Sequence, residues 1–119
     1  MKIIYNGEQD ARLYKKVLGG IIESLLKEDE NVIYFDADLS NCIGIACGTA
    51  AVGFKPIVHT FGPFASRRVY DQIFLSGGYA QNPITVIGTD PGITAAFNGG
   101  THMPFEDVAL YRAIPGTVI

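Results

Sequence analysis

Apolar residues recur at helical spacing near the start of the chain. Asp10 stands where a helix N-cap would, and a charged stretch follows at 27–31. An apolar stripe of period close to four, bounded in this way, predicts a helix that faces a core. Its residues are Leu13, Val17, Ile21 and Leu25, widened by Leu18, Ile22 and Leu26.

Short apolar runs rich in branched and aromatic side chains predict strands at 32–35, 56–60 and 84–89, buried on both faces. Helical patterns separate and follow them at 43–52, 65–80 and 105–113, and 117–119 is expected to begin another strand. Gly53 is expected to end the helix at 43–52. Because parallel strands need crossover connections, the alternation predicts an α/β fold, a three-layer Rossmann-like domain with a mainly parallel sheet.

Composition narrows the class of protein. The 119 residues form one expected domain, 1–119, with 48% hydrophobic and 18% charged residues. In a domain this small, so high an apolar content favours a surface that is shared with another chain. A net charge of −3 argues against nucleic acid as a partner, and no apolar run is long enough for a membrane span. The start of the chain lacks a signal-peptide core, and Cys42 and Cys47 are expected to be buried thiols, so we expect a cytoplasmic protein.

The ends of the predicted strands locate a candidate site. Ligands of parallel sheets bind beyond the carboxyl ends of the strands. Here those ends are 36–40, 60–64 and 90–102. We expect these segments to converge on one edge of the sheet.

Two aromatics and a histidine are the main candidates at this edge. Phe61 and Phe64 lie on a Gly-Pro turn, where they can either stack on a flat heterocycle or cap the core. His102 follows two glycines, which allow close approach of a ligand. It can either exchange a proton with a substrate or cap the next helix.

The other charged or polar candidates have simpler interpretations. His59 ends a buried strand and is expected to be structural. Arg67 and Arg68 are adjacent, so at most one is expected to face the site and clamp an anion, the other being solvated or paired with Asp71. Arg12 is by default a solvated residue.

Long segments of the chain resemble a known family. The stretches at 53–68, 88–107 and 111–116 look like the pyrimidine-binding domain of transketolase, and 3–12 and 35–39 resemble its start in the C-terminal subunit of two-chain transketolases. The resemblance implies a thiamine diphosphate-binding fold of the pyrimidine-binding type. It also implies a cytoplasmic dimeric transferase of the pentose phosphate pathway, which moves a two-carbon ketol unit between sugar phosphates. Thiamine diphosphate and Mg²⁺ would lie between chains, with the metal and the diphosphate held by a diphosphate-binding subunit or domain.

The resemblance assigns roles by position. Phe61 and Phe64 match the aromatics that hold the aminopyrimidine ring. His102 matches a catalytic histidine that faces the donor sugar. Asn98 stands where many relatives have an aspartate that contacts a substrate hydroxyl, and Arg12 and Ser40 fall near positions that contact the substrate phosphate. No residue of this chain is assigned to the metal.

The departures from the family pattern concern catalysis. The family carries a glutamate before the Gly-Ile-Ala helix, where it hydrogen-bonds the aminopyrimidine and promotes activation of the cofactor. Here 39–43 runs straight into Gly44, with Asp38 as the nearest carboxylate, and no Gly-Asp-Gly metal motif is present. We therefore expect an internally shortened and C-terminally truncated form of the domain.

Two function classes follow. The chain is either part of a genuine transketolase, contributing the aminopyrimidine side of the cofactor site, or a non-catalytic interaction module that keeps the fold without the activating glutamate. In both cases we expect the isolated chain to be inactive and to associate with a copy of itself or with a diphosphate-binding chain. A dinucleotide-binding domain is disfavoured because no G-x-G-x-x-G motif follows the first strand.

Overall fold

The computed structural model describes residues 14–36 and 41–119, which belong to two compact units, 1–30 and 31–119. In the first unit, the predicted helix is confirmed as α1 (Tyr14–Glu28), with Lys27 and Glu23 paired at 2.7 Å on its surface. The expected N-cap Asp10 and Leu13 lie outside the described residues. None of the described helices combines the length and the apolar character needed to cross a bilayer.

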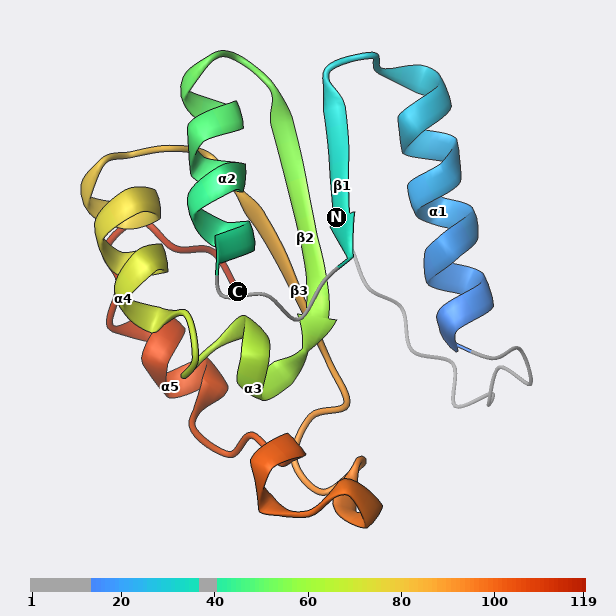
Figure 1. Cartoon of the computed structure of the whole chain (residues 1–119), viewed down its shortest axis with the longest axis vertical. Helices are drawn as coiled ribbons and strands as arrows, with labels where there is room; N and C mark the ends of the chain where they lie inside the picture. The colour runs from blue at the N-terminus through green and yellow to red at the C-terminus, as the bar shows by residue number, and fades with distance from the viewer. Residues whose placement is uncertain (1–13, 37–40) are drawn as a thin grey trace. The chain divides into compact units, whose positions relative to one another are not determined.

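The second unit is built on a parallel sheet, as predicted (Figure 1). Its described strands are β1 (Val32–Asp36), β2 (Lys55–Phe61) and β3 (Thr85–Thr89), in the order β1-β2-β3. The register places Asp36 beside His59, and Phe61 beside Thr89. The strands therefore end together, and the segments that follow β2 and β3 start from the same edge.

Helix α2 (Asn41–Ala51) confirms the second predicted helix and ends as expected at Gly53. Gly53 has a φ of +97°, and its N–H donates to the Ala50 carbonyl at 3.0 Å. The N–H of Phe54 donates to the Thr49 carbonyl at 3.1 Å. This pair of bonds is a Schellman motif, which needs a left-handed residue and so favours glycine.

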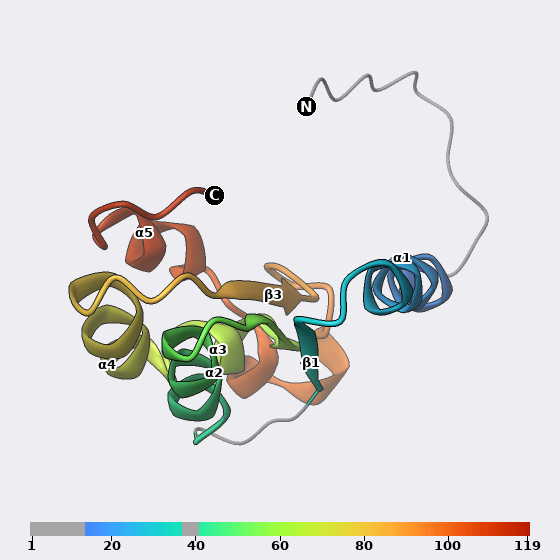
Figure 2. The ribbon, with the colours of Figure 1, turned by 90° about the horizontal axis from the view of Figure 1, so that it is seen from above.

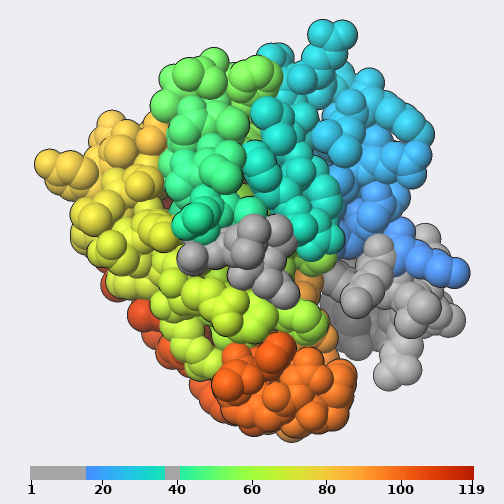
Figure 3. All heavy atoms as spheres, viewed as in Figure 1, coloured from blue at the N-terminus to red at the C-terminus, as the bar shows by residue number. Residues whose placement is uncertain are grey.

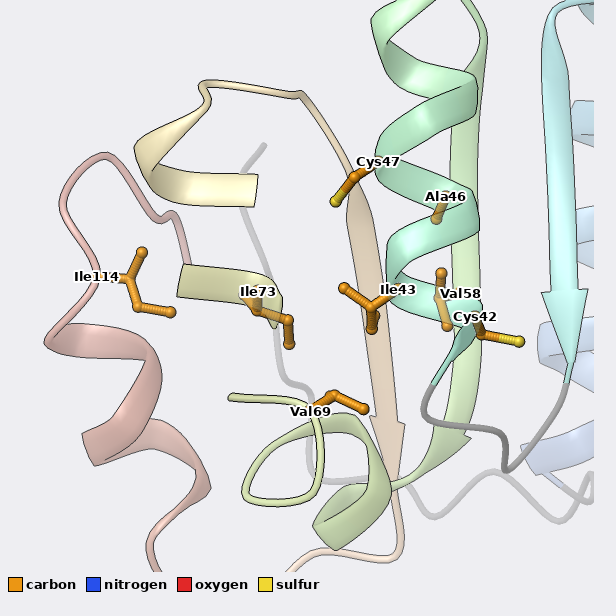
Figure 4. Close-up of a cluster of buried hydrophobic side chains, with 8 residues drawn as sticks. All are labelled: Cys42, Ile43, Ala46, Cys47, Val58, Val69, Ile73 and Ile114. Carbon is orange, nitrogen blue, oxygen red and sulfur yellow. The ribbon is translucent and has the colours of Figure 1, made fainter. Parts of the chain in front are cut away.

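The core lies between α2, β2 and the segment that follows β2. Figure 4 shows this cluster, and in Figure 2 α2, α3 and α4 lie on the same side of the sheet. Small residues such as Ala46, which is fully buried, let α2 approach the strand closely. Both thiols of α2 are free and buried, as expected, and burial raises the pKa of Cys47. The cluster consists of Cys42, Ile43, Ala46, Cys47, Val58, Val69, Ile73 and Ile114.

The single helix predicted over 65–80 is wrong. The structure has α3 (Gly62–Ala65), a turn, α4 (Tyr70–Gln72) and then η1 (Ile73–Tyr79), a π-helix. Ser66 breaks the regular path, because its Oγ donates to the Gly62 carbonyl at 2.7 Å while its backbone leaves the helical region. Val69 and Ile73 nevertheless point into the core, so the apolar period persists through the break.

The last helix, α5 (Asp107–Arg112), begins two residues later than predicted. Tyr111 donates from its hydroxyl to the Ala65 carbonyl at 2.5 Å, and Ile114 completes the core. The strand predicted at 117–119 is wrong, since the described sheet does not include it. Gly116, at a φ of +80°, and the bond from the Thr117 N–H to the Ile114 carbonyl turn the chain there.

Candidate functional site

The two candidate phenylalanines come from the junction of β2 and α3. Phe61 is the last residue of β2, and Phe64 lies in α3, which starts at once because Pro63 is suited to the first turn of a helix. The two rings meet edge to face, with centroids 6.1 Å apart. Both side chains are half-buried, so their junction is neither a fully packed core nor a solvated loop.

His102 reaches these rings from the segment after β3. That segment forms two short 3-10 turns, η2 (Ala96–Asn98) and η3 (Gly100–His102). The imidazole centroid lies 5.4 Å from that of Phe61 and 5.0 Å from that of Phe64, again edge to face. Of the three strand ends that were predicted to converge, those after β2 and β3 meet here and bring together the three main candidates, while 37–40 lie outside the described residues. In Figures 1 and 3 this segment lies against α3.

A close contact between Pro104 and Gly62 helps to set the path of this segment. Pro104 is buried against Gly62, where a Cβ atom would stand only 2.6 Å from the proline Cγ. The carbonyl of Pro104 accepts a bond from the Gly92 N–H at 3.1 Å. Gly62 is therefore required for the approach of the two segments, not for an unusual backbone angle.

The hydrogen bonding of His102 differentiates its two ring nitrogens. Nδ1 lies 2.9 Å from the hydroxyl of Thr101. Among the residues that the structure describes, Nε2 has no protein partner, and the side chain is half-buried. The arrangement engages one nitrogen locally and leaves the other for a ligand, which is what proton exchange or hydrogen bonding to a substrate needs.

Both neighbouring arginines contact this cluster, whereas sequence reasoning assigned at most one to the site. The Arg68 guanidinium lies over the Phe64 ring, 3.7 Å from its centroid, in a cation–π contact. Arg67 donates from Nη2 to the carbonyls of Gly100 and Thr101, at 3.0 and 3.1 Å. One face of Phe64 is thus covered by a cation, and the turn that carries His102 is bound to the end of α3.

Glu106 is a site residue that sequence reasoning missed. Its Oε1 accepts from Arg67 Nη1 at 2.9 Å, and its Oε2 accepts from the Phe105 N–H at 3.0 Å. Backbone hydrogen bonds, first that from Phe105, together with Arg67, hold the pKa of Glu106 below its usual value. No local pattern could have revealed this pair, because its members are 39 residues apart in the chain.

The β1 side of the edge holds a separate polar group. The Tyr34 hydroxyl and His59 Nδ1 are 2.7 Å apart, and Asp36 Oδ1 lies 3.6 Å from the same nitrogen. His59 Nε2 is buried without a hydrogen-bond partner in the described part of the chain. His59 therefore lies inside the sheet, on partners from β1, and does not join Phe61, Phe64 and His102.

Of the remaining substrate-binding candidates, the structure describes Asn98. Asn98 ends η2 and is exposed, with its N–H bonded to the Ala95 carbonyl at 2.9 Å. Arg12 and Ser40 lie outside the described residues. Within the described ranges, no cluster of three histidine, cysteine or carboxylate side chains could hold a metal ion.

Large apolar side chains surround the turn of His102 and face outward. Ile93 and Phe105 are each 70% exposed, and Phe97 is 89% exposed. Single exposed apolar residues are ordinary, but three on one short segment next to a candidate site are typical of an interaction surface.

Comparison with known proteins places this chain in a family. Residues 40–119 match the family described as "Transketolase, pyrimidine binding domain". A subunit named 6-deoxy-6-sulfo-D-fructose transketolase subunit SqwH, from Clostridium sp. (strain MSTE9), is 54% identical over 80 residues, which cover 67% of this chain and 25% of the relative. A putative transketolase C-terminal section from Methanocaldococcus jannaschii is 31% identical over 134 residues, covering 90% of this chain and 42% of the relative.

More distant relatives and a solved structure agree with this placement. A 1-deoxy-D-xylulose-5-phosphate synthase from Natranaerobius thermophilus is 27% identical over 93% of this chain and 21% of its own length. The solved structure titled "Split gene transketolase, inactive beta4 tetramer" superposes with a TM-score of 0.72 at 24% identity, covering 85% of this chain and 40% of that chain. This last likeness concerns the fold. The chain spans less than half the length of each of these proteins.

Proposed function

Because the chain belongs to the transketolase pyrimidine-binding domain family, we propose that it supplies the aminopyrimidine side of a thiamine diphosphate site. The observation that carries the proposal is the cluster of Phe61, Phe64 and His102, assembled from the ends of β2 and β3. When bound, thiamine diphosphate supplies a carbanion-stabilising centre for the transfer of a two-carbon ketol unit. The function assigned to this chain is to hold and orient the cofactor's pyrimidine ring and to present His102 to the donor sugar.

The aromatic residues suit a flat heterocycle. Phe61 and Phe64 are half-buried, and Arg68 covers one face of Phe64, so the exposed part of the two rings offers an aromatic surface to a ligand. A stacked aromatic pair contributes about 0.5–1.5 kcal/mol beyond the burial of its area. That is enough to orient a ring and to bind it weakly, and far too little to hold the whole cofactor tightly.

The metal and the diphosphate belong, in this proposal, to another chain. The sequence lacks a Gly-Asp-Gly motif. The exposed side chains of Ile93, Phe97 and Phe105 beside the aromatic cluster support a site completed at an interface, either with a copy of this chain or with a diphosphate-binding subunit. Two relatives are named as a transketolase subunit and a C-terminal section, which supports the second partner.

The residues proposed for substrate are His102, Asn98, Arg12 and Ser40. His102 would act through Nε2, the ring nitrogen not engaged by Thr101. Asn98 would offer its amide to a substrate hydroxyl, and the other two would contact the phosphate of a sugar phosphate. The relatives' names cover a sulfosugar transketolase and deoxyxylulose phosphate synthases, so they leave the sugar and the pathway open.

The alternative is a non-catalytic interaction module, and two observations favour it. The 134-residue alignment with the archaeal relative covers only 90% of this 119-residue chain, so that relative carries residues without a counterpart here. The family match begins at residue 40, beside the place where the activating glutamate is missing. In this alternative the chain keeps its partner interface but cannot support turnover.

Titration calorimetry with a diphosphate-binding transketolase subunit tests the proposal. Thiamine diphosphate and Mg²⁺ are titrated into that subunit, into this chain, and into the mixture of both, with a Phe64→Ala mixture as control. The proposal expects tighter cofactor binding by the mixture than by either protein, and loss of that gain in the Phe64→Ala mixture. Association of the two proteins without any gain in cofactor affinity would instead support the interaction module.

A further inference from the structure

Arg67 connects the end of α3 to both sides of the turn that carries His102. Nη2 bonds the carbonyls of Gly100 and Thr101, which precede His102, and Nη1 bonds Glu106, which follows it. A guanidinium presents its donors in a planar, rigid fork, so these three bonds fix one relative placement of the segments. We propose that Arg67 is a positioning residue, which holds His102 against Phe61 and Phe64.

The turn itself provides little of this order. η3 is three residues long; the His102 N–H donates to the Gly99 carbonyl at 3.0 Å, and the next bond, from the Met103 N–H to the Gly100 carbonyl, is weak, at 3.5 Å. Gly99 has a φ of +81°, and no atom lies within 4 Å of a Cβ built on Gly99 or Gly100. Two adjacent glycines without packing neighbours lose much conformational entropy on ordering, so the turn needs an external contact to stay in one conformation.

The second half of the segment has a separate attachment. Pro104 packs on Gly62, and its carbonyl is bonded by Gly92. Gly99 and Gly100 have no equivalent packing, and Arg67 bonds this half of the segment through the backbone carbonyls of Gly100 and Thr101. Loss of Arg67 should therefore release His102 while Pro104 stays in place.

Glu106 completes the attachment by orienting the guanidinium. Its carboxylate is itself held by the Phe105 N–H, so the acceptor is ordered before Arg67 binds it. Arg67 and Glu106 are both about 40% exposed, and exposed ion pairs contribute little to global stability. The consequence of the contact is therefore geometric, and it should be measured as the position of the His102 ring.

Nuclear magnetic resonance of the cofactor-free, isotope-labelled full chain tests this directly. Cross-relaxation between the ring protons of His102 and those of Phe61 and Phe64 reports the aromatic cluster, and the His59 ring is an internal reference. The variants are Arg67→Gln, which removes the fork, Arg67→Lys, which keeps only the charge, and Glu106→Gln. Arg112→Gln, an exposed arginine of α5, is the charge-matched control.

We expect Arg67→Gln to lose the His102 to phenylalanine cross-peaks and to shift the His102 ring resonances toward those of an exposed histidine. Arg67→Lys should resemble it, and Glu106→Gln should weaken the cross-peaks without abolishing them. The His59 ring and the amide signal of Gly92, which donates to the carbonyl of the anchored Pro104, should not move. If Arg67→Gln does not fold, the cross-peaks of Arg67→Lys and Glu106→Gln test whether Arg67 positions His102. Unchanged His102 cross-peaks in a folded Arg67 variant would overturn the inference.

The importance of this positioning for catalysis rests on the proposed function. The positioning of His102 by Arg67 can be detected whether or not the proposed function holds. A variant that moves His102, in a protein whose wild type shows no resonance change with thiamine, would uphold the positioning role and refute the cofactor role. If thiamine still shifts the Phe64 resonances in a variant whose His102 is released, ring binding by the phenylalanines is upheld, and it does not depend on the position of His102.

Discussion

The core under α2 and the turn of His102 are held in opposite ways. The core is a set of small and branched apolar side chains, buried beneath a helix whose stretch from Asn41 to Phe54 carries no charge. The turn is held by an arginine, a carboxylate and backbone carbonyls, most of them partly exposed. The first region is therefore expected to dominate stability, and the second to dominate the geometry of the site.

Because the two regions are held differently, substitutions in them should have different effects. Loss of a buried methyl group removes transfer free energy and leaves a cavity. Loss of an exposed polar contact changes the population of a local conformation while the fold persists. Substitutions matched between the two regions test this difference.

The largest effect is expected from Ile43→Ala. Ile43 is 2% exposed in the core cluster, so its truncation should lower the free energy of unfolding by about 2–5 kcal/mol. Ile45, on the same helix but 54% exposed, offers the control, since Ile45→Ala should stay within about 0.5 kcal/mol. Urea denaturation of both variants measures the difference, and equal losses would mean that α2 does not face the sheet as described.

Gly62→Ala should have the next largest effect, because it affects both regions. A Cβ at Gly62 would stand 2.6 Å from Pro104 and 3.1 Å from the Thr89 carbonyl, and overpacking of this kind costs about 1–3 kcal/mol. In Gly48→Ala, on α2, a Cβ meets no atom within 4 Å, and removal of a helical glycine should stabilise by about 0.5–1 kcal/mol. Opposite signs in thermal or urea unfolding are the expected outcome, and a stabilised Gly62→Ala would refute the close approach.

Tyr111→Phe isolates one buried hydrogen bond. Removal of the hydroxyl that bonds the Ala65 carbonyl should cost about 0.5–1.5 kcal/mol. Burial raises the pKa of Tyr111, so the protonated form stabilises the fold fully below the unfolded value of about 10, and this contribution falls as pH rises above it. Wild-type stability measured between pH 9 and pH 11, taken as roughly one unit on either side of that value, should therefore decline more steeply than that of the phenylalanine variant.

Glu106→Gln should have the smallest effect on stability. The carboxylate is exposed, so its replacement should stay within about 0.5 kcal/mol at neutral pH. Because the pKa of Glu106 is lowered in the fold, its stabilising contribution is present above the unfolded value and is lost as pH falls through the lowered one. The carboxyl carbon resonance of Glu106 reports that titration. In Arg67→Gln the pKa of Glu106 should return toward its ordinary range.

Regular elements of the fold were predictable because their signals are local. Short apolar runs located β1, β2 and β3, and a helical pattern ending at Gly53 located α2, all within a few residues. The helix predicted over 65–80 was wrong because the apolar period survives the break at Ser66, where a side-chain bond to Gly62 competes with the helix. The strand predicted at 117–119 is absent from the described sheet, and a turn at Gly116, with a φ of +80°, comes just before it.

The residues of the candidate site likewise fall into those that the sequence could identify and those that it could not. Phe61, Phe64 and His102 could be named from the sequence, since parallel strands bring their carboxyl ends to one edge. Arg67 and Glu106 could not be paired in advance, because the contact depends on how α3 and η3 meet across the fold. Substrate roles for Asn98, Arg12 and Ser40 remain predictions.

Resonance mapping with thiamine tests the central claim most directly, because it needs neither a partner nor turnover. Thiamine, which carries the aminopyrimidine without the diphosphate, is titrated into the labelled chain, with Phe64→Ala as the control. The account predicts weak, saturable shifts confined to Phe61, Phe64, His102 and their neighbours, lost in the control, with His59 unmoved. Shifts centred elsewhere, or shifts that persist unchanged in Phe64→Ala, would contradict the assignment of the aromatic cluster as the pyrimidine-binding side of the site.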